Sequence, residues 1–83
     1  MEERIHSGYT IIQSIKLPDE EFVLGVKHSK FSTEYVTWCC VEKTKYYHGH
    51  YISNYDFAVI DLYERAKEAI KWKLQYLQGG DNN

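Results

Sequence analysis

The sequence predicts an α+β fold in which a four-stranded antiparallel β-meander packs against one long C-terminal α-helix. Three observations predict it. Between residues 9 and 52 four runs are typical of β-strands, and in the first two of them apolar residues recur at every second position, the period of a β-strand. Short polar segments separate these runs, as in hairpins. From residue 54 to residue 78 the apolar spacing changes to steps of three and four, the period of an α-helix. A length of 83 residues suits one domain, so we expect residues 1–83 to form a single domain.

The first two strands, at about 9–17 and 21–28, are expected to form a hairpin around the turn sequence "PDEE". Proline fixes its backbone for an early turn position, and Asp19 can hydrogen-bond locally. In the second strand Gly25 lies on the other face from the apolar residues, and a glycine inside a strand indicates a bulge or a close neighbour. In each strand, alternation places every second residue on the same face. These residues are Tyr9, Ile11, Gln13, Ile15 and Leu17 in the first strand, and Phe22, Leu24, Val26 and His28 in the second.

The third and fourth strands are expected at about 34–42 and 45–52. The third carries large residues on both faces, which is typical of a central strand or of one covered on both sides. Its two faces hold Tyr35, Thr37, Cys39 and Val41, and Val36, Trp38 and Cys40. In the fourth, "KYYHGHYI", strict alternation turns two sets of residues to opposite sides: Tyr46, His48, His50 and Ile52, and Tyr47, Gly49 and Tyr51.

The helix is expected from about residue 54 to residue 78. Ser53 can cap its N-terminus, and Asp56 three residues later completes an S-x-x-D box. Gly79 and Gly80 are expected to end the helix and to leave residues 79–83 as a tail. Such a helix is about 37 Å long, against about 27 Å for an eight-residue strand, so it should extend past the sheet.

The helix has an apolar side and a polar side. We expect the apolar side to face the sheet, and the polar side to include Asp61 and Arg65, which are spaced for an i,i+4 ion pair. The residues of the apolar side are Val59, Leu62, Ala66, Ala69, Ile70, Leu74 and Leu77. The residues of the polar side are Asp61, Glu64, Arg65, Glu68, Lys71 and Gln75.

Charge and cysteine content narrow the classes of partner. The net charge is −2, the pI is about 6.0, and the lysines are scattered among acidic residues, which argues against binding to a phosphate backbone. The charged N-terminus has no apolar signal-peptide core, and no apolar run reaches membrane-spanning length. Cys39 and Cys40 are adjacent and point to opposite faces of a strand, so we expect reduced thiols. We therefore expect a cytoplasmic protein with no membrane partner.

The segment 45–56 is rich in tyrosine and histidine and leaves two binding chemistries open as alternatives. In a regular strand His48 and His50 would lie side by side and could bind a metal, although a structural zinc site needs four ligands. A sheet face of aromatic residues could instead stack on the bases of single-stranded nucleic acid. The residues available for stacking are Tyr46, Tyr47, Tyr51 and Trp38. We predict neither catalysis nor a cofactor, because the sequence shows no glycine-rich phosphate loop and no nucleophile with a positioned base.

Contact with another protein is the binding mode that we predict. One helix covers one sheet face, so the other face is expected to be wet or to hold a partner, and a neutral, tyrosine-rich surface suits protein contact. Trp72 and Tyr76 lie four residues apart on the helix, where they either pack on the sheet's edge or contact a partner or a second copy. The candidate binding residues are Tyr35, Trp38, Tyr46, Tyr47, His48, His50, Tyr51, Trp72 and Tyr76.

Three segments, "EFVLGV", "YVTWCC" and "YYHGHYISNYDFAVIDLYER", cover much of residues 21–65 and carry a family resemblance. Together they resemble a group of small uncharacterised proteins from Gram-positive bacteria, their phages and integrative elements, through the pattern "YVTW…GHY…Y…A…D…Y.R". The resemblance implies that the gene lies among the short accessory genes of mobile elements, which often encode inhibitors or adaptors that act by binding. We therefore expect a non-enzymatic protein-binding module, an inhibitor or adaptor, with a homo-oligomer left open.

Overall fold

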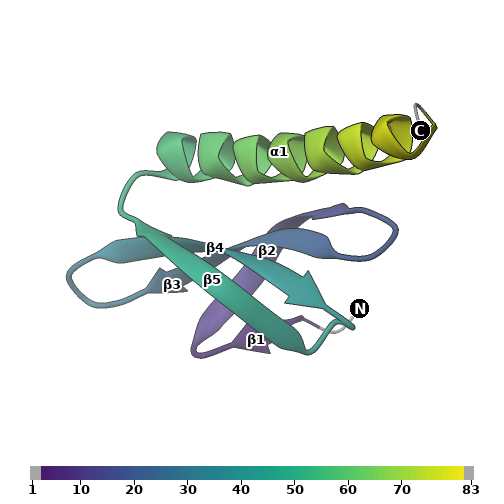
Figure 1. The fold of residues 1–83 in the computed structure, drawn as a ribbon. Helices are drawn as coiled ribbons and strands as arrows, with labels where there is room; N and C mark the ends of the chain where they lie inside the picture. The colour runs from purple at the N-terminus through teal and green to yellow at the C-terminus, as the bar shows by residue number, and fades with distance from the viewer. Residues whose placement is uncertain (1–2, 82–83) are drawn as a thin grey trace.

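The computed structural model describes residues 3–81, and the side chains of residues 3–75. It has one antiparallel sheet with the strand order β1-β2-β3-β4-β5 and one helix, α1 (Figure 1). The elements are β1 (Ile5–His6), β2 (Tyr9–Lys16), β3 (Glu21–His28), β4 (Thr33–Val41), β5 (Lys45–Ile52) and α1 (Tyr55–Asp81). The α+β class, the antiparallel sheet and the C-terminal helix are confirmed, and β4 is an interior strand as predicted. The prediction of four strands is wrong, because β1 adds a fifth.

Strand β1 is too short to show an alternating pattern in the sequence. It pairs with β2 through Ile5↔Thr10 and His6↔Tyr9, so only Ser7 and Gly8 form the turn between them. Both turn residues have positive φ, 52° and 84°, as the two-residue hairpin turn that matches the twist of a sheet requires. The dipeptide Ser-Gly was the available signal for this hairpin.

Strand β2 does not keep one set of residues on one face. Its register against β3 shifts between Ile11 and Gln13, because an extra residue forms a β-bulge there. Tyr9 and Ile11 therefore pack on one side of the sheet, whereas Ile15 and Leu17 pack on the other. The prediction that all of these residues share a face is wrong, since a one-residue insertion reverses every side chain beyond it.

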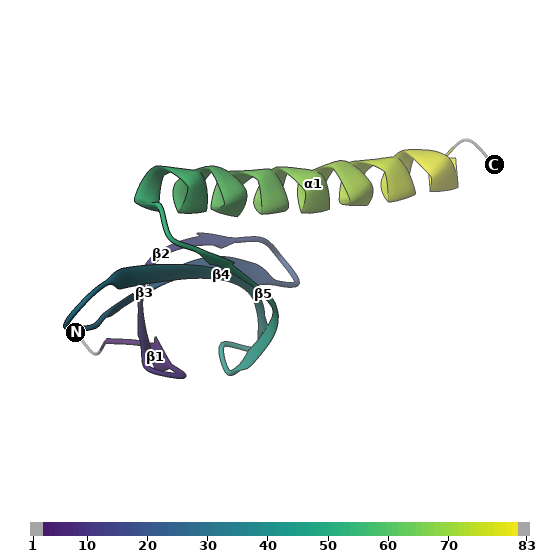
Figure 2. The ribbon, with the colours of Figure 1, turned by 90° about the vertical axis from the view of Figure 1, so that its left-hand side faces the viewer.

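The sheet has a hydrophobic core on each face. The core between the sheet and α1 contains Leu17, Phe22, Leu24, Ala58, Leu62 and Ala66. The core on the opposite face contains Tyr9, Val23, Val36, Trp38 and Cys40. Figure 2 shows that the sheet curls, with β1 and β5 bending away from α1 on the side of the second core. The face opposite the helix was expected to be open, but it is largely filled by the protein's own side chains.

Gly25 packs closely against residues of the second core. A Cβ atom at this position would lie 3.0 Å from Cβ of Tyr9 and 3.3 Å from Cγ1 of Val36. Of the two alternatives predicted for Gly25, a bulge or a close neighbour, the structure shows the close neighbour.

The helix begins and ends at other residues than predicted. Asn54, not Ser53, caps its N-terminus, because Oδ1 of Asn54 accepts a hydrogen bond of 2.9 Å from the backbone amide of Phe57. The helix continues through Gly79 and Gly80 to Asp81, so the predicted tail is helical up to that residue. Glycine costs only about 1 kcal/mol relative to alanine inside a helix, so a glycine pair does not have to end one.

Only the first part of α1 rests on the sheet. Ala58, Leu62 and Ala66 are buried against it, whereas Ile70 and Leu74 are exposed. The prediction that Ile70 and Leu74 face the sheet is therefore wrong. The side chain of Leu77 lies outside the described residues. Lys73 ends the contact region, where its Nζ lies 2.7 Å from a carboxylate oxygen of Asp19 in the β2–β3 turn. Beyond it the helix extends past the sheet, as its length predicted (Figure 2).

Among the described residues, no helix has the length and hydropathy needed to cross a membrane.

Candidate interaction surface

Strand β5 contains the Tyr- and His-rich segment, and its register is interrupted at His48. Thr37 of β4 pairs with His50 while Cys39 pairs with Tyr47, so His48 and Gly49 together oppose one residue of β4, Trp38. His48 has a φ of 54°, as expected at a β-bulge.

The bulge redistributes the side chains of β5 between the two faces. Tyr46 and Tyr51 pair with Cys40 and Val36 and lie on the face opposite the helix, whereas Tyr47 and His50 pair with residues of the helix side. The predicted side-by-side arrangement of His48 and His50 is therefore wrong, because the extra residue breaks the alternation between them.

Trp38 is buried with an exposed fraction of 4%, although a solvent-facing aromatic was expected on its face. Its indole meets the rings of Tyr46 at 5.3 Å, His6 at 4.9 Å and Tyr9 at 5.6 Å between ring centroids, all edge-on. His6 also stacks on Tyr46 at 4.1 Å. These rings pack on one another, so their faces contribute to the second core.

Arg4 closes the rim of the second core. Its Nη1 donates a hydrogen bond of 2.9 Å to Glu21, and its Nη2 lies 3.2 Å from the hydroxyl of Tyr46 and 3.4 Å from Sγ of Cys40. The hydrogen bond to the Glu21 carboxylate raises the pKa of Arg4, which stays charged. The segment before β1 is thus tied to β3, β4 and β5.

A polar cluster joins the other face of the sheet to the helix. Thr37 is fully buried, and its hydroxyl donates a hydrogen bond to Asp61. Nη1 of Arg65 donates to the backbone oxygen of Thr37 at 2.9 Å and to its hydroxyl at 3.1 Å. Nδ1 of His50 lies 3.0 Å from Oδ2 of Asp61. Asp61 and Arg65 therefore point to the sheet, and the prediction that they lie on the polar side facing away is wrong.

This cluster has the residue types of an acid–base site but not the access. A His–Asp pair beside a hydroxyl can in principle activate a nucleophile. Here the hydroxyl belongs to Thr37, whose exposed fraction is 0%, and both of its neighbours bind it from the helix. Burial lowers the pKa of Arg65 because it disfavours the charged form, but the guanidinium stays protonated. The arrangement fixes the helix on the sheet.

The remaining sequence-predicted residues are divided between the two faces of the sheet and the helix. Tyr47 and Tyr51 are exposed on opposite faces of β5. Tyr35 is half-buried on the helix side, where its ring contacts Tyr55 edge-on at 5.6 Å. Trp72 is exposed rather than packed on the sheet's edge. The side chain of Tyr76 lies outside the described residues.

The helix carries an exposed apolar surface that the sequence interpretation missed. On the side of α1 turned from the sheet, Ile60 is 55% exposed, Tyr63 57%, Ile70 42% and Leu74 54%. Phe57, one turn before, is also exposed. We call the residues Ile60, Tyr63, Lys67, Ile70 and Leu74 the outer stripe. The available signal was their spacing of three, four, three and four residues.

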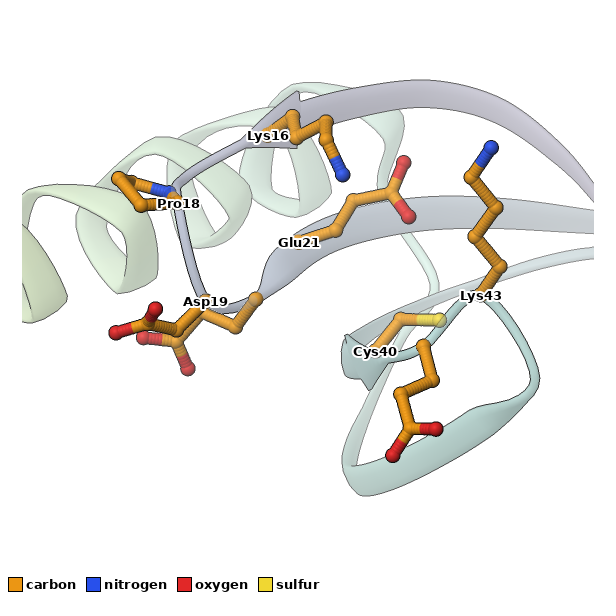
Figure 3. A pocket seen from close by; sticks show the side chains of 8 residues that line it. Lys16, Pro18, Asp19, Glu21, Cys40 and Lys43 are labelled. Atoms are coloured by element: carbon orange, nitrogen blue, oxygen red, sulfur yellow. The ribbon is translucent and has the colours of Figure 1, made fainter.

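An open pocket of about 360 Å³ lies at the end of the sheet between the β2–β3 and β4–β5 turns (Figure 3). Its carboxylates are already engaged: Glu21 binds Arg4, and Glu20 accepts a hydrogen bond from Sγ of Cys39 at 3.3 Å. The thiol of Cys40 at its wall is almost fully buried. The lining residues are Lys16, Pro18, Asp19, Glu20, Glu21, Cys40, Glu42 and Lys43. The pocket is charged and shallow, unlike the mostly apolar cavities that hold small molecules.

Among the side chains of residues 3–75, no group of three or more His, Cys, Asp or Glu is close enough to hold a metal ion. This leaves the histidine-based alternative without a ligand set among those residues, because His48 and His50 are separated by the bulge.

The comparison of the chain with protein-family models, with curated proteins and with solved structures finds no match.

Proposed function

We propose that the protein is a non-enzymatic protein-binding module whose contact surface is the outer stripe of α1, extended by Phe57. One observation carries the proposal. Five large apolar side chains on the solvent side of a single helix are each exposed by 42% to 65%: Phe57, Ile60, Tyr63, Ile70 and Leu74.

The arrangement of these residues supports a binding role better than their number does. Single exposed apolar residues are common on protein surfaces, whereas several on one side of a helix, here on either side of Lys67, form the kind of apolar patch that marks an interaction site. Residues at i, i+3, i+7 and i+10 line one side of a helix and match the anchors that helices place into grooves or against other helices. Tyr63 belongs to the residue types that contribute most to protein interfaces.

The position of the outer stripe also supports the proposal. The tie between Thr37, Asp61 and Arg65 holds the opposite side of α1 on the sheet, so the outer stripe has no cover within the described part of the chain. The base-stacking alternative is less favoured, because Trp38 and Tyr46 pack within the second core. An inhibitor or adaptor role in the cytoplasm, encoded by a phage or mobile element, remains part of the proposal and rests on the sequence alone.

The test is a pull-down from a lysate of the bacterium that encodes the protein. We expect specific proteins on the wild-type bait, and their loss on a bait with both Tyr63→Glu and Ile70→Glu. Both positions are exposed and glutamate is a good helix former, so the fold should persist. The matched control is Tyr47→Ser with Tyr51→Ser on β5, which should retain the captured proteins. Capture that is unaffected by the helix substitutions, or recovery of RNA or DNA in place of protein, would overturn the proposal.

A further inference from the structure

We infer that the outer stripe binds the outer stripe of a second copy of this chain, with the two helices antiparallel. This inference rests on the proposed function and specifies the partner. It makes the protein a two-fold symmetric dimer in which each sheet lies outside the helix pair.

The spacing of the outer stripe is that of a coiled-coil seam. Ile60, Tyr63, Lys67, Ile70 and Leu74 take the positions a, d, a, d and a of a heptad repeat. This average step of 3.5 residues keeps a seam on one side of a helix and lets it interlock with a second helix of the same repeat. The sheet-facing residues Leu62 and Ala66 fall at c and g, outside the a and d positions.

The fold leaves room for a second helix on this side. Leu62 points to the sheet, and Leu74 is twelve residues later, which at 100° per residue is a rotation of about 120°. A helix laid along the outer stripe therefore approaches α1 well away from its own sheet. Figure 2 shows the strands gathered on one side of α1, with the C-terminal end of the helix extending past them.

Charge favours the antiparallel orientation. Glu64 and Lys71 both lie at e positions beside the seam, and neither belongs to an ion pair among the described residues. In an antiparallel pair, e positions face e positions, so Glu64 meets Lys71 of the second copy and Lys71 meets its Glu64. A parallel pair would instead place Lys67 directly against Lys67 of the second copy, which is repulsive.

Lys67 at the centre of the seam sets the strength of the association. Its aliphatic stem can cover apolar surface while its ammonium group reaches water, but a lysine at an a position lowers coiled-coil stability. We therefore expect a reversible dimer, with the monomer recovered on dilution.

Sedimentation equilibrium of the full chain, from about 10 μM to about 1 mM, measures this association. The wild type should approach the dimer mass as its concentration rises, and Ile70→Glu should remain a monomer. Either Glu64→Lys or Lys71→Glu alone should weaken dimerisation about fivefold, because each replaces two attractive contacts by repulsive ones. The double variant Glu64→Lys with Lys71→Glu should restore it. The matched control is Glu68→Lys, the same charge change on an exposed residue away from the seam, which should dimerise like the wild type.

Three results would contradict the inference: a wild type that stays monomeric throughout, a dimer that Ile70→Glu leaves intact, or a double charge swap that does not restore association. If the chain is monomeric but the pull-down still loses its proteins with Tyr63→Glu and Ile70→Glu, only the second-copy inference fails. If neither measurement responds to outer-stripe substitutions, the proposed function fails with it.

Discussion

The hydroxyl of Thr37 on β4 donates a hydrogen bond to the carboxylate of Asp61 on α1, 24 residues further along the chain. Thr37 is fully buried in an otherwise largely apolar layer between sheet and helix. A buried hydroxyl without a partner is costly, so this bond restricts how the helix can rotate on the sheet. The bond thereby also fixes which side of α1 faces away, and that side is the outer stripe.

The first prediction concerns this bond. Asp61→Ala should lower the free energy of unfolding by about 1–3 kcal/mol, because it leaves the buried Thr37 hydroxyl without its acceptor. Thr37→Val should cost about 1 kcal/mol, since the remaining partners, Asp61 and Arg65, can be solvated. Urea denaturation measures both values, with Glu68→Ala as the exposed helix control. Equal stability of Asp61→Ala and the wild type would mean that the cluster does not hold the helix.

The second prediction concerns the β5 bulge. A Cβ atom at Gly49 would lie 2.8 Å from the indole nitrogen of Trp38, so Gly49→Ala should destabilise the protein by about 1–3 kcal/mol. Gly49→Ala combined with Trp38→Phe should cost less than the sum of the two single changes, because the smaller ring relieves the overlap. Thermal unfolding of the four proteins gives this coupling, and strict additivity would show that the two side chains do not compete for space.

The third prediction separates the two candidate helix caps. Asn54→Ala should lower the free energy of unfolding by about 1 kcal/mol, because the backbone amide of Phe57 loses its acceptor. Ser53→Ala should change it by no more than about 0.3 kcal/mol, the scale of a surface substitution. Chemical denaturation measures both free energies of unfolding. A larger loss for Ser53→Ala than for Asn54→Ala would show that Ser53, the cap predicted from the sequence, is the true cap.

The fourth prediction concerns pH. Burial, followed by the hydrogen bond to Glu20, raises the pKa of Cys39 to about 11 from an ordinary value of about 9. The folded state thus retains the thiol proton where the unfolded chain has lost it, so stability from this group is complete below pH 9 and falls as pH rises to 11.

Cys39→Ser removes this titration. Between pH 8 and pH 10.5 the wild type should lose about 1 kcal/mol more unfolding free energy than Cys39→Ser, a value reduced for the partial exposure of the thiol. The comparison cancels the alkaline titration of other groups, including Lys73, whose pKa is raised by its hydrogen bond to Asp19. Parallel pH profiles of the two proteins would show that burial of the thiol has no such effect.

Period and turn chemistry were enough to predict most of the fold. Four of the five strands and the helix follow from alternating apolar residues, from "PDEE" and from the three- and four-residue steps after residue 54. The bulges at Ile12 and His48 were not predicted, because an inserted residue looks like continued strand in the sequence and is detected only by the register of its neighbour. A β-bulge bends its strand and increases the local twist, so bulges missed in the sequence also leave the curl of the sheet unpredicted.

The candidate site was harder to predict for a related reason. The sequence separates apolar from polar positions on a helix, but α1 has two apolar sides, one against Leu17 and Phe22 and one toward solvent. Only the strands decide which side is covered. Ile70 and Leu74 were assigned to the covered side because they continue the spacing from Leu62, whereas the structure leaves both exposed on the side of α1 turned from the sheet.

The most direct test of the central claim is site-specific photo-crosslinking in the cell that makes the protein. p-Benzoylphenylalanine placed at Tyr63 or at Ile70 should form protein adducts on irradiation, and the same group at Tyr47 should form few or none, although Tyr47 has a comparable exposed fraction of 47%. Mass spectrometry then identifies each adduct as a second copy or another protein. Adducts from Tyr47 but none from the two helix positions would contradict the assignment of the outer stripe as the contact surface.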